Sequence, residues 1–226
     1  PEIEFLATKQ CPSRDTAYEI AFGRFLARAY LQMLGLLGER KDDLAHWAVD
    51  FLRHGMDYPV ARTTGSNFYW PEDPAIPDFF VEWPGLETQM SHRHFSHLCM
   101  LYPLGEIHRF SPYRRLRTAR NTIHMLILRG SGGWAGFSFP WASLLATRAG
   151  WPLRMPFEML EQFAHCVTVA FNGLSLNEDH RRLGVINQTG AFGPFHLENF
   201  SLESSLIAMT AVQDALLHAA GDHLVF

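Results

Sequence analysis

Cysteine is scarce in this sequence, and charge of one sign is not in excess. Cys11, Cys99 and Cys166 are odd in number, far apart and outside any CxxC motif, so they indicate no disulfide framework. The formal net charge is −4 and the isoelectric point is near 6.3, which does not favour a nucleic-acid partner or an anionic membrane surface. We find no signal peptide and no apolar run expected to span a bilayer, so no membrane segment is predicted.

The composition favours one sizeable core. The chain has 226 residues, of which 47% are hydrophobic, and it contains 18 Phe and 6 Trp. These aromatic rings suit a core and also provide flat surfaces for sugar rings. The chain begins at Pro1-Glu2 without an initiator Met and ends in apolar residues, so we expect a fragment of a longer protein and leave its compartment open.

Helical periodicity dominates the sequence. Apolar residues recur at helical spacing, and a glycine (Gly38, Gly55, Gly130 or Gly150) follows most of these stretches. The stretches predict helices from Ser13 to Leu37, Lys41 to His54, Ser111 to Arg129, Ser138 to Arg148, Pro152 to Val167 and about Ser201 to Ala219. Loops are predicted at Met56–Met90 and Asn172–Gly193. With no alternating strand pattern, the prediction is an all-α fold of helical hairpins whose long loops gather on one face.

The most unusual segment is Ser91–Leu98, in which three imidazoles and a guanidinium fall within six residues. We expect a helix to start at Ser91, with His94 and His97 on one face and with His92 and Arg93 at the helix mouth. Three interpretations remain open. The histidines could bind a metal, although their spacings of two, three and five differ from the i, i+4 pairs typical of helical metal sites. They could instead be satisfied by backbone carbonyls, or they could donate hydrogen bonds to the hydroxyl groups of a polyol, which we favour.

The glycine-rich stretch Gly130–Gly136 gives no sign of a nucleotide site. It lacks the lysine and the spacing of a phosphate-binding loop, so its glycines are expected to let the backbone approach a ligand or a helix. No metal and no cofactor are therefore predicted for this chain.

Several segments carry a family resemblance. His92-Arg93-His94-Phe95-Ser96-His97-Leu98, followed by Leu101-Tyr102-Pro103, resembles the HRHLSHL–LYP signature of glycoside hydrolase family 95, mainly inverting α-L-fucosidases with some L-galactosidases. In the same order, Leu128–Gly130 with Gly136–Trp141 resembles the LRG…GWSLAW segment, and Pro194–Phe200 resembles PFQIDGNFG. Upstream, Glu82-Trp83 resembles the EW before the histidine motif, and Pro1-Glu2 resembles the tail of an SPE motif.

The resemblance implies a six-hairpin (α/α)₆ toroid, of which residues 1–226 would form one domain, the C-terminal part. Helices preceding Pro1 would be the missing partners of the same domain. Glu198 falls where the family has its general-base aspartate, with one glycine deleted after it, and Glu2 falls where the general acid lies. The asparagines that assist the base in the family lie upstream of Pro1, so the isolated chain is expected to be inactive.

Substrate-binding roles follow from the same resemblance. Arg93 and His94 fall on residues that contact the sugar, and His92 is expected beside them. Trp134 and Phe195 would offer ring faces to the apolar side of the sugar, with Asn199 next to the general base.

Two hypotheses for the function stay open. The first is inverting hydrolysis of a terminal α-L-fucosyl or similar residue by the carboxylate pair. The second is a non-catalytic carbohydrate-binding or scaffold toroid that keeps the pocket but has lost the acid–base pair.

Overall fold

The computed structural model describes residues 14–40, 42–63, 76–86, 91–131, 133–166 and 201–226. Within these ranges the chain is mostly helical, as the all-α prediction requires, and the strands are short. The α-helices are α2 (Ala17–Leu37), α3 (Asp43–His54), α4 (Tyr113–Arg129), α5 (Ser138–Arg148), α6 (Arg154–Cys166) and α7 (Leu202–Leu216), with a single 3₁₀ turn, η1 (Ser96–Leu98).

Local signals explain where the first helices begin and end. Thr16 and Glu19 form a reciprocal capping box that starts α2, three residues later than the predicted start at Ser13. Gly38 ends α2 in the left-handed conformation (φ 69°), as predicted. The side chain of Asp42 accepts a hydrogen bond from the Ala45 N–H and so caps α3.

Two antiparallel strand pairs differ from the prediction. β1 (Val60–Thr63) pairs with β2 (Ile76–Phe80) inside the stretch that was predicted to be loop. β3 (His218–Ala220) and β4 (His223–Val225) form a hairpin where the last helix was expected to continue, because α7 ends at Leu216. Strands of three to five residues are too short to leave a readable alternation in the sequence.

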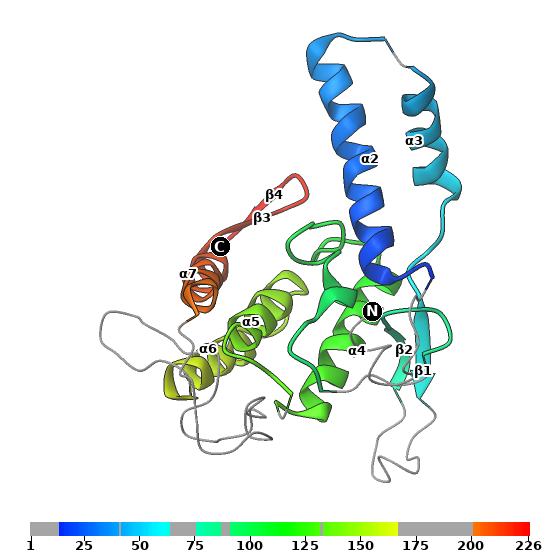
Figure 1. The fold of residues 1–226 in the computed structure, drawn as a ribbon. Coiled ribbons are helices and arrows are strands. Elements are labelled where there is room, and N and C mark those ends of the chain that lie inside the picture. The colour runs from blue at the N-terminus through cyan, green and yellow to red at the C-terminus, as the bar shows by residue number, and fades with distance from the viewer. Residues whose placement is uncertain (1–13, 41, 64–75, 87–90, 132, 167–200) are drawn as a thin grey trace.

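α4 lies at the centre of the described structure (Figure 1). β2 packs on one side of it and α5 on the other, and α5 in turn contacts α6 and α7. The core is completed by the segment that follows the histidines, whose Phe95, Leu98, Met100 and Leu101 are fully buried. This central position of α4 places its two ends at two different surface regions.

The α2–α3 hairpin extends away from the other elements (Figure 1). Its apolar residues remain largely exposed toward the tip, for example Leu36 at 80% and Met33 at 58%. By length and composition alone, α2 is long and apolar enough to cross a membrane, which corrects the expectation that no apolar run is long enough. Arg24 of α2 forms an ion pair with Glu106 (2.9 Å), which holds the first half of α2 against the rest of the described structure.

Candidate functional site

The histidine segment is not the start of a helix. Residues 91–95 are irregular, and only Ser96–Leu98 forms a 3₁₀ turn. The Ser91 hydroxyl donates to the Gly130 carbonyl (2.7 Å) and accepts from the Gly133 N–H (2.8 Å), instead of capping its own helix. The predicted helix was wrong because the capping side chain is used for tertiary hydrogen bonds to the end of α4.

A buried glutamate anchors the other end of the segment. Glu82 Oε1 accepts hydrogen bonds from the Ser96 hydroxyl (2.9 Å), the His97 N–H (3.3 Å) and His97 Nδ1 (3.1 Å). Burial raises the pKa of Glu82, but the hydrogen bonds from His97 and Ser96 outweigh it, and the net pKa lies below the ordinary value. His97 is fully buried, so it supports the segment from within the core and not at the surface.

The other two imidazoles and the guanidinium are half-buried on the outer side of the segment. His92 Nδ1 lies 3.1 Å from the His94 backbone nitrogen and 3.4 Å from the His94 carbonyl oxygen, so it accepts or donates according to the tautomer of the ring. The His94 ring is 5.3 Å from the His92 ring, centroid to centroid, and stacks on Phe137 at 5.5 Å with an interplanar angle of 23°. The Arg93 carbonyl accepts from the Ser138 hydroxyl (2.8 Å). These contacts fix the backbone and both rings of His92-Arg93-His94.

Gly133 allows the glycine-rich loop to approach the histidine segment. A Cβ at this position would lie 2.4 Å from the Ser91 carbonyl oxygen and 2.8 Å from its carbon. Because both are backbone atoms, no side-chain rotation could relieve the contact. The expectation that a glycine in this loop serves close backbone approach is therefore confirmed at Gly133.

Trp134 does not lie where the sequence placed it. Its exposed fraction is 3%, and its ring packs edge-on against Phe95 and Phe139 at 5.2 and 5.1 Å. Both rings belong to the main core. This placement disagrees with the prediction that Trp134 presents a ring face to a sugar, since its faces are used for core packing.

Four of the predicted site residues lie outside the described ranges. These are Glu2, Phe195, Glu198 and Asn199, and the loop predicted at Asn172–Gly193 also falls there. Within the described ranges, no three His, Cys, Asp or Glu side chains form a group that could hold a metal ion. The described part of the site is thus the set His92, Arg93 and His94 with its supports.

Local sequence patterns do not reveal those supports. Glu82, Phe137 and Ser138 appear in the quoted segments, but no role had been assigned to them. The signal that could have pointed to Glu82 is an acidic residue that follows apolar residues shortly before the histidines. Such a residue is buried in the structure, and an acidic residue is rarely buried without partners.

The arrangement provides hydrogen-bond donors on a rigid backbone. The His92 and His94 imidazoles and the Arg93 guanidinium are groups of a kind that donates to hydroxyl oxygens, and the segment that carries them is held at both ends. Neither a family model nor a curated protein matches this sequence. The likeness to a family therefore rests on the segments and on how they pack together.

Proposed function

We propose that this chain contributes the sugar-binding part of an inverting glycoside hydrolase similar to family 95, with a terminal α-L-fucosyl or similar residue as substrate. One observation carries the proposal. The segments that resemble the family are distant in sequence, yet Ser91 bonds to Gly130 and Gly133, Arg93 bonds to Ser138, and Glu82 bonds to Ser96 and His97. The histidine segment, Glu82 and the Gly130–Ser138 region are thus in mutual contact, and this contact supports the proposal for the segments that the structure describes.

In this proposal, His92, Arg93 and His94 bind the hydroxyl groups of the sugar. Their hydrogen-bond donors suit equatorial and axial hydroxyls, and the stacking of His94 on Phe137 restricts its ring orientation. Trp134 is left out of the sugar contacts because it is buried in the core. Phe195 and Asn199 complete the sugar site as proposed contacts.

The chemistry requires two carboxyl groups. Glu198 acts as general base and takes a proton from a water that attacks the anomeric carbon, while Glu2 acts as general acid and protonates the leaving glycosidic oxygen. In an inverting site the two carboxyl groups stand roughly 6.5–9.5 Å apart, which leaves room for that water. The proposed scaffold is an (α/α)₆ toroid in which further helices pack beside those described.

The mechanism is tested by the anomer released. Hydrolysis of 4-nitrophenyl α-L-fucoside by the protein that carries this chain, followed by proton NMR, is expected to give β-L-fucose first, which then mutarotates. Glu198→Gln should lower kcat about 10²–10⁴-fold, because the amide cannot accept the proton. Glu203→Gln, an exposed carboxylate in the first turn of α7, is the matched control and should leave kcat unchanged.

Three outcomes would contradict parts of the proposal. Initial release of α-L-fucose would exclude inversion, and full activity of Glu198→Gln would exclude the general-base assignment. Sugar binding by the native protein with no hydrolysis of α-L-fucosides or α-L-galactosides would favour the non-catalytic carbohydrate-binding alternative. In each case binding is measured separately, by isothermal titration with L-fucose.

A further inference from the structure

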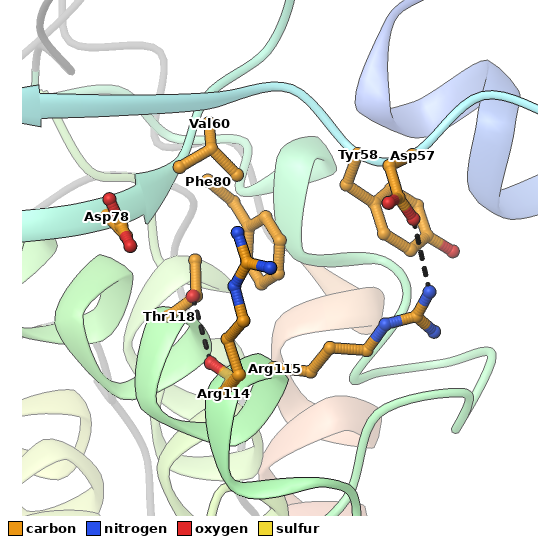
Figure 2. Close-up of a pocket in the computed structure, with 8 residues that line it drawn as sticks. All are labelled: Asp57, Tyr58, Val60, Asp78, Phe80, Arg114, Arg115 and Thr118. Carbon is orange, nitrogen blue, oxygen red and sulfur yellow. Dashed lines mark hydrogen bonds and ion pairs between the residues drawn. The ribbon is translucent and has the colours of Figure 1, made fainter.

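A pocket lies at the opposite end of α4 from the histidine segment. A pocket of about 270 Å³ opens between the loop after α3, the β1–β2 pair and the first two turns of α4 (Figure 2). Residues 57–58, Val60 and Phe80 form one side of it, and Arg114 and Thr118 form the other. This volume is close to the lower limit for small-molecule pockets, which suits a ligand of metabolite size.

The pocket is distinct from the proposed sugar site. Thr118 lines it near the start of α4, whereas the histidine segment bonds to Gly130 just beyond the end of the helix. Twelve residues of α-helix separate these positions, which corresponds to about 18 Å at 1.5 Å per residue. A ligand in the pocket therefore would not contact His92, Arg93 or His94.

Most charges around the pocket are already paired. Arg115 contacts Asp57 at 3.2 Å and also reaches buried Glu106 at 3.4 Å. Asp78 is 2.9 Å from Arg62 and 3.9 Å from Arg117, and these arginines hold the pKa of Asp78 below its ordinary value. Each of the two acidic residues that line the pocket thus has an arginine partner.

Arg114 is the exception. Among the described residues its guanidinium has neither an ion pair nor a hydrogen bond, and it acts on Asp78 only through longer-range attraction. In Figure 2 its side chain rises through the middle of the pocket, with the guanidinium in front of the Phe80 ring. The first turn of α4 contains no acidic residue that could offset this charge. The pocket therefore carries one positive charge that a ligand can neutralise.

The remaining lining suits an apolar group. Val60 is 48% exposed and stands across from Thr118, and the Phe80 ring forms the floor between them. The Thr118 hydroxyl donates to the Arg114 carbonyl (3.0 Å), so its oxygen can only accept from a ligand.

We propose that this pocket binds a small organic monocarboxylate, with the carboxylate on Arg114 and the apolar part against Val60 and Phe80. A guanidinium matches a carboxylate in a planar, two-bond geometry. A phosphate dianion is disfavoured, because the acidic side chains of Asp57 and Asp78 line the same small space. A cation is disfavoured by Arg114 itself. The proposal does not depend on the glycosidase assignment.

The probe for the test is 4-fluorobenzoate, observed by fluorine NMR while the protein is titrated. Binding is expected to broaden and shift the fluorine signal, and Arg114→Met should weaken the affinity about tenfold or more. Arg53→Met, an exposed arginine of α3 outside the pocket, removes the same charge and should leave the affinity unchanged. Circular dichroism of both variants checks that the fold is retained.

Competition decides the class of ligand. Neutral 4-fluorobenzamide should bind at least tenfold more weakly than 4-fluorobenzoate, and inorganic phosphate should not displace it. The proposal is overturned if 4-fluorobenzoate does not bind at 10 mM, if Arg114→Met binds it as well as the native protein does, or if the benzamide binds equally well. Displacement by phosphate at lower concentration would overturn the monocarboxylate assignment in favour of a phosphate site.

Discussion

Glu82 is the residue on which the shape of the histidine segment depends. Its carboxylate is nearly buried and accepts three hydrogen bonds, two of them from His97 and one from Ser96. Such an arrangement stabilises the fold only while all the donors find an acceptor, because an unsatisfied buried group keeps its full desolvation cost. The proposed sugar-binding residues therefore depend on a carboxylate that does not itself face the sugar.

Replacing this carboxylate tests its structural role. Glu82→Gln keeps a carbonyl oxygen that can accept the three hydrogen bonds of Oε1 but removes the negative charge that strengthens them, so we expect the free energy of unfolding to fall by about 2–3 kcal/mol. Urea denaturation followed by fluorescence measures it. Glu39→Gln, on an exposed residue beyond α2, is the control, and equal stability of both variants would contradict this role for Glu82.

Cys99 offers a second prediction at this scale. Its thiol is buried beside Glu82, and burial raises the pKa of the thiol to about 12. At pH 8 only about one thiol in ten thousand is then ionised, and the thiolate is the reactive form. We expect iodoacetamide to alkylate Cys99 far more slowly in the native protein than in urea, as measured by peptide mass spectrometry. Similar rates in both states would show that Cys99 is accessible.

At the scale of elements, the backbone of the glycine-rich loop approaches the backbone of the histidine segment closely at Gly133. Gly133→Ala would place a Cβ 2.4 Å from the Ser91 carbonyl oxygen, so the loop must move. We expect thermal unfolding to show a loss of about 2–4 kcal/mol. In contrast, Gly35 of α2 has no atom within 4 Å of its would-be Cβ, and Gly35→Ala should stabilise the helix by about 0.5–1 kcal/mol. The reverse order of stability would refute this interpretation of Gly133.

The helices were largely predictable, because their signals are local. The start of α5 at Ser138 and the stops at Gly38 and Gly130 agree with the prediction. The short strands and the end of α7 were missed, because pairing between distant segments decides them.

The site was less predictable than the fold. The histidine segment stood out in the sequence, but its conformation did not, because Ser91 bonds to Gly130 and Gly133 and such tertiary bonds leave no trace in local spacing. Trp134 was misplaced for a similar reason, since an aromatic ring beside a glycine-rich loop can equally face a ligand or enter the core. Arg114 was not singled out, because only the fold shows which arginines of α4 find acidic partners.

At the scale of the whole molecule, a charge cluster around Glu106 joins the α2–α3 hairpin to the rest of the described structure. Glu106 accepts from Arg24 at 2.9 Å, from Arg28 at 2.9 Å and from the Tyr58 hydroxyl at 2.7 Å. Burial raises the pKa of Glu106, but the hydrogen bonds from Arg28 and Tyr58 and the nearby arginine charges lower it by more. The net pKa is therefore below the ordinary value.

The sign of this shift predicts the response to acid. A carboxylate whose pKa is lower in the folded state stabilises the fold above the ordinary glutamate pKa, and this contribution is lost as pH falls through the lowered value. We expect the urea midpoint to drop between about pH 5 and pH 3, the range around the ordinary glutamate pKa. Glu106→Gln should flatten this drop. Glu158→Gln, which breaks an exposed pair with Arg154, should leave it unchanged. An equally steep drop in both variants would exclude Glu106 as its source.

The anchoring of α2 at one end has a consequence for its motion. Its buried residues lie in the first half, from Ala17 to Ala27, whereas Leu36 and Leu37 at the tip are mostly exposed. Helical amides exchange with solvent deuterium when their hydrogen bonds open locally, and opening costs least where tertiary packing is absent. Deuterium uptake should therefore rise steadily along α2 from its capped beginning to Gly38, so that the hairpin frays from its tip while its base remains closed.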